Sequence, residues 1–231
     1  MYAKSVDILA QLKLLGSPEN VAGMARFGIN PESAFGIKVT TLRQLAKDIG
    51  RDHQLALDLW DSGFHEARML ATIIDDPKLI TEQQMEKWIK DLNSWDLTDG
   101  LAGNLIDKTP FAYEKAIEWS HRQPEFEKRL GFALMAWLPV HDKKAPDEKF
   151  EVFFPQLEAE SDDDRIYVKK AVSWALRNIG KRNLTLNAAV IPIAESIAAR
   201  ESKAAKWIAS DVLRELRSEK IQTRLKLKAA K

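Results

Sequence analysis

The sequence contains no cysteine in 231 residues, which excludes disulfide bonds, thiolate nucleophiles and cysteine-ligated zinc or iron–sulfur centres. Its four histidines form no HxxxH or HExxH pair, and glycine-rich GxGxxG and GxxxxGK[ST] loops are absent. We therefore expect neither a metal ion nor a cofactor. No stretch approaches about 18 apolar residues, and the first residues lack the apolar run of a signal peptide. These absences predict a soluble, cytoplasmic protein.

Charge is balanced over the whole chain but divided along it. The 35 Lys and Arg residues and 34 Asp and Glu residues give a net charge of +1. Residues 165–231 hold 16 basic and 5 acidic residues, a net charge of +11, whereas residues 1–164 carry a net charge of −10. This division predicts that the C-terminal third meets an anionic partner, either a nucleic acid or a membrane surface.

Nearly every segment between turn signals has apolar residues at the helical period, and strand-like alternation is absent. Pairs such as Ser17-Pro18 and Thr109-Pro110 fall between these segments, since a residue before proline is disfavoured in a helix. Thr81 begins a capping box. The pattern predicts an all-α chain with helices over residues 4–15, 18–28, 38–49, 52–61, 65–75, 81–92, 94–107, 110–121, 125–140, 147–158, 163–180, 185–199 and 202–217.

A weak internal repeat favours a helical-repeat architecture over a compact bundle. Four helical segments align on a basic residue, at Arg68, Arg129, Lys170 and Lys206. The last two intervals, 41 and 36 residues, bracket the low end of a two-helix HEAT unit. We therefore expect a curved α-solenoid of HEAT-like helical repeats with a basic concave face. Residues 1–218 are expected to form a single domain, and residues 219–231 a basic, frayed tail with little to bury.

The segment Ser94-Trp95-Asp96-Leu97-Thr98-Asp99 places an indole and a carboxylate on one helix face, because Trp95 and Asp99 are four residues apart. Ser94 is a candidate helix cap, and Asp96 lies in the first turn, where the helix dipole favours an acid. Asp99 lies beyond that turn and is a candidate chemical group. The alternatives are a solvated acid or a buried salt bridge for Asp99, and a core residue for Trp95.

Basic residues form a second candidate site in the C-terminal third. Lys170, Trp174, Arg177 and Lys181 fall on one stripe of the helix over 163–180, while Val168, Ala171, Val172, Ala175, Leu176 and Ile179 supply its buried side. A basic stripe interrupted by an indole suits a phosphate backbone, and a solvated charged face is the alternative. Lys206 belongs to a similar stripe on the last predicted helix. For Arg129, the alternative to a phosphate contact is a surface ion pair with Glu125.

These elements occur in an order that resembles the AlkD-like DNA alkylation repair family, HEAT-like-repeat glycosylases that excise N3- and N7-alkylated purines. The resemblance is carried by MARF at 24–27, Gly36-Ile37, LRQLAKDI at 42–49, SWDLTD at 94–99, Lys128-Arg129 and KKAVSWALR at 169–177. It covers most of the chain, and its specificity comes from the conjunction of these segments in register.

The resemblance implies roles for individual residues. Asp99 corresponds to the catalytic carboxylate, Trp95 and Trp174 to two tryptophans that face the sugar, and Arg129 and Arg177 to arginines that contact the DNA backbone. Phe27 stands where the family has tyrosine, so a hydroxyl contact to DNA is lost while the ring remains. We also count Lys170, Lys181 and Lys206 as DNA-binding residues, from the charge pattern.

The implied reaction is monofunctional hydrolysis of the N-glycosidic bond of 3-methyladenine and 7-methylguanine in double-stranded DNA. No lysine has an evident reason for a depressed pKa, which argues against a Schiff base. The resemblance favours a monomer without cofactor, metal or membrane partner, associated with the nucleoid if bacterial. Two alternatives remain: a non-catalytic HEAT-repeat module that binds damaged or branched DNA, and a scaffold for a protein partner.

Overall fold

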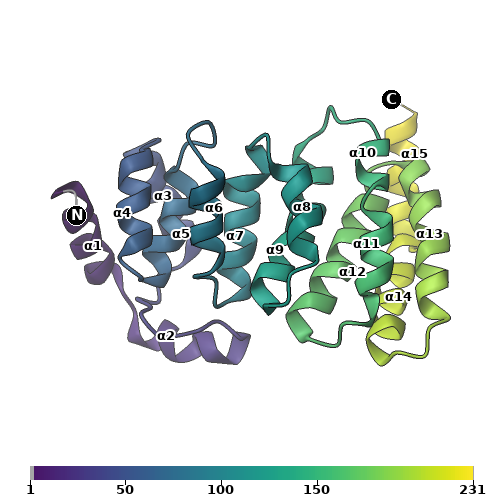
Figure 1. Cartoon of the computed structure of the whole chain (residues 1–231), viewed down its shortest axis with the longest axis horizontal. Helices are drawn as coiled ribbons and strands as arrows, with labels where there is room; N and C mark the ends of the chain where they lie inside the picture. The colour runs from purple at the N-terminus through teal and green to yellow at the C-terminus, as the bar shows by residue number, and fades with distance from the viewer. Residues whose placement is uncertain (1–2, 231) are drawn as a thin grey trace. The chain divides into compact units, whose positions relative to one another are not determined.

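The computed structural model describes residues 3–230, and the regular elements within them are all helical (Figure 1). This confirms the all-α prediction. The α-helices are α1 (Ala3–Leu15), α2 (Pro18–Met24), α3 (Val39–Ile49), α4 (His53–Asp61), α5 (His65–Ile74), α6 (Glu82–Ile89), α7 (Trp95–Asn104), α8 (Ala112–Ser120), α9 (Glu125–His141), α10 (Glu148–Glu151), α11 (Phe154–Ala159), α12 (Ile166–Gly180), α13 (Leu184–Ala198), α14 (Lys203–Leu216) and α15 (Glu219–Ala229), with 3-10 turns at Ala25–Phe27, Ile106–Lys108 and Glu160–Asp162.

The chain divides into two compact units, Met1–Pro110 and Phe111–Lys231. Each unit buries an apolar core of its own, and the single domain expected over 1–218 stays a prediction. In the N-terminal unit α5 packs against α3, α4 and α7. Trp60 and Trp88 stack there with parallel rings 4.0 Å apart, and both side chains are completely or almost completely buried.

The C-terminal unit is built around α9 and α12. Helix α9 packs between α8 and α12, and α14 packs against both α12 and α13. Gly131 permits the close approach of α8 and α9, because a Cβ atom there would lie 2.4 Å from the backbone nitrogen of Ser120. All six apolar residues predicted for the inner side of α12 are buried.

The structure corrects two predicted segments. The helix predicted over 147–158 is divided into α10 and α11, because Pro155 lacks an amide hydrogen and is tolerated only in the first turn of α11. Residues 219–229 of the predicted frayed tail form α15. Ser218 caps this helix, and Ile221 and Leu225 are buried one turn apart. Lys231, the end of that tail, lies outside the described residues.

Boundary signals explain where several helices begin. Thr81 accepts a hydrogen bond from the amide of Gln84, as the capping box predicts. The segments predicted over 18–28 and 94–107 each end in a 3-10 turn rather than continuing as α-helix. Within residues 3–230, no helix has the length and hydropathy to cross a bilayer, and no three His, Asp or Glu side chains are grouped as metal ligands.

Candidate nucleic-acid interface

The residues predicted to form the site divide between the two units. The N-terminal unit holds Phe27, Trp95 and Asp99, and the C-terminal unit holds Arg129, Lys170, Trp174, Arg177, Lys181 and Lys206.

Trp95 and Phe27 lie next to each other in the N-terminal unit although 68 residues separate them. The indole Nε1 of Trp95, the first residue of α7, donates to the carbonyl of Phe27 at 2.8 Å. Gly28 follows in the left-handed conformation at φ 69°, and the Phe27 side chain is 73% exposed. Asp99 is half-buried one helical turn after Trp95. The Trp95 indole thus contacts the backbone of Phe27, and Asp99 follows one turn later on the same helix.

Asp96 has a structural partner that the sequence pattern does not indicate. Ser94 occupies the N-cap position of α7, as predicted, but its side chain makes no capping hydrogen bond. The Asp96 carboxylate instead pairs at 2.9 Å with Nε2 of His65, which is the first residue of α5. Burial alone would raise the pKa of Asp96, but the hydrogen bond and charge of His65 hold that pKa below its ordinary value. Burial alone would lower the pKa of His65, but the hydrogen bond to Asp96 and the charge of Asp96 raise that pKa above its ordinary value.

We expect the His65–Asp96 pair to make stability depend on pH. The contribution of Asp96 is lost as pH falls through its lowered pKa, below 3.8, and that of His65 is lost as pH rises through its raised pKa, above 6.5. The pair therefore stabilises most between these values. His65→Gln should cost about 1 kcal/mol more at pH 5.5 than at pH 9 in urea unfolding followed by tryptophan fluorescence. A cost independent of pH would contradict this expectation.

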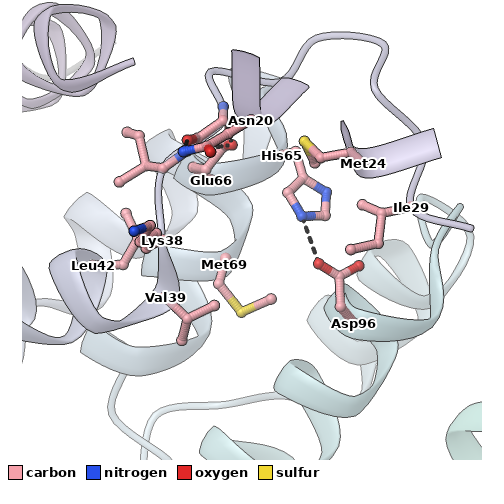
Figure 2. A pocket seen from close by; sticks show the side chains of 12 residues that line it. Asn20, Met24, Ile29, Lys38, Val39, Leu42, His65, Glu66, Met69 and Asp96 are labelled. Atoms are coloured by element: carbon pink, nitrogen blue, oxygen red, sulfur yellow. Dashed lines mark hydrogen bonds and ion pairs between the residues drawn. The ribbon is translucent and has the colours of Figure 1, made fainter. Parts of the chain in front are cut away.

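The His65–Asp96 pair borders a small cavity in the N-terminal unit (Figure 2). Met24, Ile29 and Met69 contribute apolar walls to this cavity of about 190 Å³. Its volume is below the roughly 300–1,000 Å³ of most ligand pockets. The candidate interface of this unit is therefore the region of Phe27, Trp95 and Asp99 rather than the cavity.

Trp174 belongs to an aromatic cluster in the C-terminal unit. Its ring meets Trp137 of α9 edge to face, with centroids 5.3 Å apart. Trp137 in turn stacks on His141 at 4.7 Å. Trp174 and Trp137 are both half-buried, so Trp174 combines a packing role with a partly accessible ring face.

Arg177 and Lys181 are held by carboxylates of α14. Arg177 bonds Glu215 at 2.6 Å and Asp211 at 3.2 Å, and Lys181 bonds the other oxygen of Glu215 at 2.7 Å. Burial alone would raise the pKa of Glu215, but its bonds to Lys181 and Arg177 hold that pKa below its ordinary value. Part of the positive charge predicted for this stripe is thus neutralised within the unit.

We expect Glu215→Gln to strengthen DNA binding. The change removes the carboxylate shared by Arg177 and Lys181, so Lys181 becomes available to phosphate and Arg177 keeps only Asp211 as an acidic partner. Affinity at low salt should rise by about fivefold, and the dependence of log K on log salt should steepen by about 0.9 for each additional phosphate that is neutralised. Fluorescence anisotropy with a labelled duplex at several salt concentrations measures both quantities.

Glu201→Gln is the matched control for Glu215→Gln. Glu201 is an exposed acid in the same unit, so its replacement makes the same change in net charge without releasing Arg177 or Lys181. Equal effects of the two variants would mean that overall charge, and not the pairing at Glu215, limits DNA binding.

The remaining basic residues differ in accessibility. Arg129 is only 5% exposed and donates to the carbonyl of Tyr167, so it ties α9 to α12. Arg68, at the corresponding repeat position in the N-terminal unit, likewise donates to backbone carbonyls. Lys170 and Lys206 are exposed. The exposed lysines suit phosphate contact directly, and the DNA contact predicted for Arg129 stays a prediction.

Comparison with known proteins identifies the family. The model of the DNA alkylation repair enzyme family matches residues 8–192. Uncharacterized proteins of Listeria innocua and Listeria monocytogenes are 25% and 27% identical over 130 residues, which is 54% of this chain. The match spans 57% of each relative, little more than half its length.

A solved structure supports the fold. It belongs to a new family of proteins related to the HEAT-like repeat DNA glycosylases with affinity for branched DNA structures. The TM-score is 0.73 at 22% identity, and the alignment covers 91% of this chain and 94% of that chain. This likeness confirms the predicted HEAT-like repeat fold. Because the family model covers most of the sequence, this chain belongs to the DNA alkylation repair enzyme family.

Proposed function

We propose that this protein is a monofunctional DNA glycosylase that removes cationic alkylated purines, such as 3-methyladenine and 7-methylguanine, from double-stranded DNA. The observation that carries the proposal is the position of Asp99 one helical turn after Trp95 on α7, with the Trp95 indole bonded to the backbone carbonyl of Phe27, whose side chain is exposed. Membership of the DNA alkylation repair enzyme family supports it.

The proposed chemistry needs a carboxylate but no acid. A purine alkylated at N3 or N7 is positively charged, so its glycosidic electron pair leaves with the base and neutralises it. Positive charge then develops on the deoxyribose, where a carboxylate stabilises it electrostatically. Water adds to C1′ and loses a proton, which leaves an abasic site and a free neutral base. Asp99 is the carboxylate in this proposal.

The aromatic residues act beside that carboxylate. An indole face attracts a nearby positive charge through cation–π interaction, and we assign this role to Trp95. Trp174, with a partly accessible ring in the C-terminal unit, is proposed to contact the sugar. Phe27 presents an exposed ring without the hydroxyl of tyrosine, so it packs against DNA without donating a hydrogen bond.

Binding to the backbone is assigned to the basic residues of the C-terminal unit. Lys170 and Lys206 are exposed, and Arg177 and Lys181 lie on the same stripe of α12 with their charge shared by Glu215. Each phosphate contact adds a salt-sensitive term to the affinity. The protein is proposed to act as a monomer, since these contacts need only one chain.

A second candidate is a non-catalytic module that binds branched DNA. The solved relative has affinity for branched DNA structures, and Phe27 departs from the tyrosine of the resembled family. The same basic residues would then bind DNA while Asp99 carries no reaction. A protein scaffold is the third and weakest alternative, because it gives no role to Trp95 and Asp99 together.

Two measurements separate these functions. Incubation with methylated duplex DNA, followed by chromatography of the released bases, should yield methylpurines with this protein and none from unmethylated DNA. Binding without release supports the branched-DNA module. If the protein does not bind DNA, or if its DNA binding does not weaken as salt rises, both DNA functions are overturned and the protein scaffold remains.

A further inference from the structure

A basic cleft of about 890 Å³ lies in the C-terminal unit, where the ends of α9 and α12 approach α15. Its volume is near the upper end of the roughly 300–1,000 Å³ typical of ligand pockets, so it accommodates more than a single small anion. Asp147 is the acidic side chain of its lining, and five lining side chains are cationic: Lys143, Lys181, Arg182, Arg224 and Lys228.

Two of these cations have structural partners. Arg182 donates to the carbonyls of Pro139 and Ala145 and is within 3.7 Å of Asp147, so it holds the loop between α9 and α10 in place. Lys181 bonds Glu215. The local charge of these two residues is therefore largely balanced.

The other three cations retain their charge. Lys228 donates to the carbonyl of Arg182 at 2.7 Å, and Arg224 to that of Lys181 at 3.4 Å. A carbonyl is uncharged, so these bonds position the two side chains without neutralising them. Lys143 is exposed on the loop after α9. Within residues 3–230, none of these three has an ion pair with a carboxylate.

Helix α15 orients Arg224 and Lys228 toward the cleft. Ile221 and Leu225 are buried in the unit, and Gln222 donates to Asn187 and to the carbonyl of Leu216. Arg224 and Lys228 are four residues apart and share another side of the helix. The segment that the sequence predicts to be frayed is thus an anchored helix that presents cations.

We propose that this cleft binds the phosphodiester backbone of a nucleic acid, apart from the position where a base is removed. The proposal rests on the DNA-binding function proposed above and assigns α15 a part in it. Several cations that retain their charge around a concave site suit a chain of phosphates. A membrane surface fits less well, because it cannot enter a cleft and the apolar residues Ile221 and Leu225 are already buried.

The test compares two double variants of α15 in the full chain. Arg224→Gln with Lys228→Gln removes two charges from the cleft. Lys220→Gln with Lys226→Gln removes two charges from exposed positions of the same helix that do not line it. Gln has nearly the same helix propensity as Lys and Arg, so both variants should fold, which circular dichroism verifies.

Binding to a fluorescein-labelled duplex of about 30 base pairs without lesions is measured across salt concentrations. The cleft variant is expected to lower the slope of log K against log salt by about 1.8, because two phosphates are no longer neutralised, and the control variant by much less. Equal slopes for the two variants overturn the cleft while DNA binding by the protein stands. Absence of DNA binding by the unmodified protein overturns both proposals.

A separate binding measurement with phosphatidylglycerol vesicles tests whether the cleft binds a lipid surface. We expect the two double variants to bind these vesicles equally. If the cleft variant loses vesicle binding and keeps its DNA binding, the ligand is a lipid surface and the nucleic-acid assignment is wrong.

Discussion

Asp99→Asn is expected to abolish most base release while leaving DNA affinity nearly unchanged. The amide keeps the size of the side chain but removes the negative charge that opposes the developing charge on the sugar. Loss of one well-placed electrostatic group costs about 100- to 1,000-fold in rate. Single-turnover release of 7-methylguanine at saturating protein measures the rate, and anisotropy measures the affinity, which should change by less than about threefold.

Asp96→Asn is the matched control for this experiment. It makes the same chemical change in the same helix, three residues earlier, where the carboxylate pairs with His65. We expect it to reduce stability and to keep base release at temperatures where the protein is folded. If Asp99→Asn releases base as fast as the unmodified protein, Asp99 is not the catalytic carboxylate.

Glu66→Gln is expected to produce a large loss of stability in the N-terminal unit. Glu66 is 2% exposed, and its carboxylate accepts hydrogen bonds from the amides of Phe35, Gly36 and Ile37 at 2.7, 2.6 and 3.1 Å. Gln retains one acceptor oxygen and places a donor against the remaining amides. Because hydrogen bonds to a charged group contribute about 1.5–3 kcal/mol each, the cost should be about 3 kcal/mol.

Hydrogen exchange locates this loss. Amides of residues 35–37 should exchange about 100-fold faster in Glu66→Gln, because about 1.4 kcal/mol corresponds to a tenfold change. Glu32→Gln, an exposed acid in the same segment, should change stability by less than about 0.5 kcal/mol. Unchanged protection of residues 35–37 would show that Glu66 does not hold this loop.

The loop over residues 35–37 also requires a glycine at position 36. Gly36 has φ 78°, and a Cβ atom there would lie 2.3 Å from the carbonyl oxygen of Ser17. The sequence contains Gly36 and Glu66 thirty residues apart, with no local signal that connects them. Their relation depends on how α5 packs against the loop, and a single sequence does not reveal such packing.

Most of the helical fold is predictable from the sequence because it follows from local rules. The apolar period, the prolines and the capping box at Thr81 place most helices near their observed positions. Helix α15 escapes prediction because only Ile221 and Leu225 bury apolar surface, and that burial depends on helices already in place. The prediction of one continuous helix over 147–158 is wrong, because the apolar period alone does not show the break before Pro155.

The candidate site is predictable to a lesser degree. The sequence places Trp95 and Asp99 on one helix face, and the stripe of α12 follows from spacing alone. The partners of these residues lie far along the chain: His65 is 31 residues from Asp96, and Glu215 is 38 residues from Arg177. The sequence around His65 has no metal-site spacing, and Glu215 lies within a basic region. Neither pattern indicates that these residues pair with Asp96 and Arg177.

The most direct test of the proposed function is a single incubation with a duplex that contains one 7-methylguanine. We predict free 7-methylguanine and an equal amount of abasic site, with strand breakage only after alkali. Strand breakage without alkali would contradict the monofunctional assignment. Binding of the duplex without release of the base would contradict the glycosylase and identify a DNA-binding module instead.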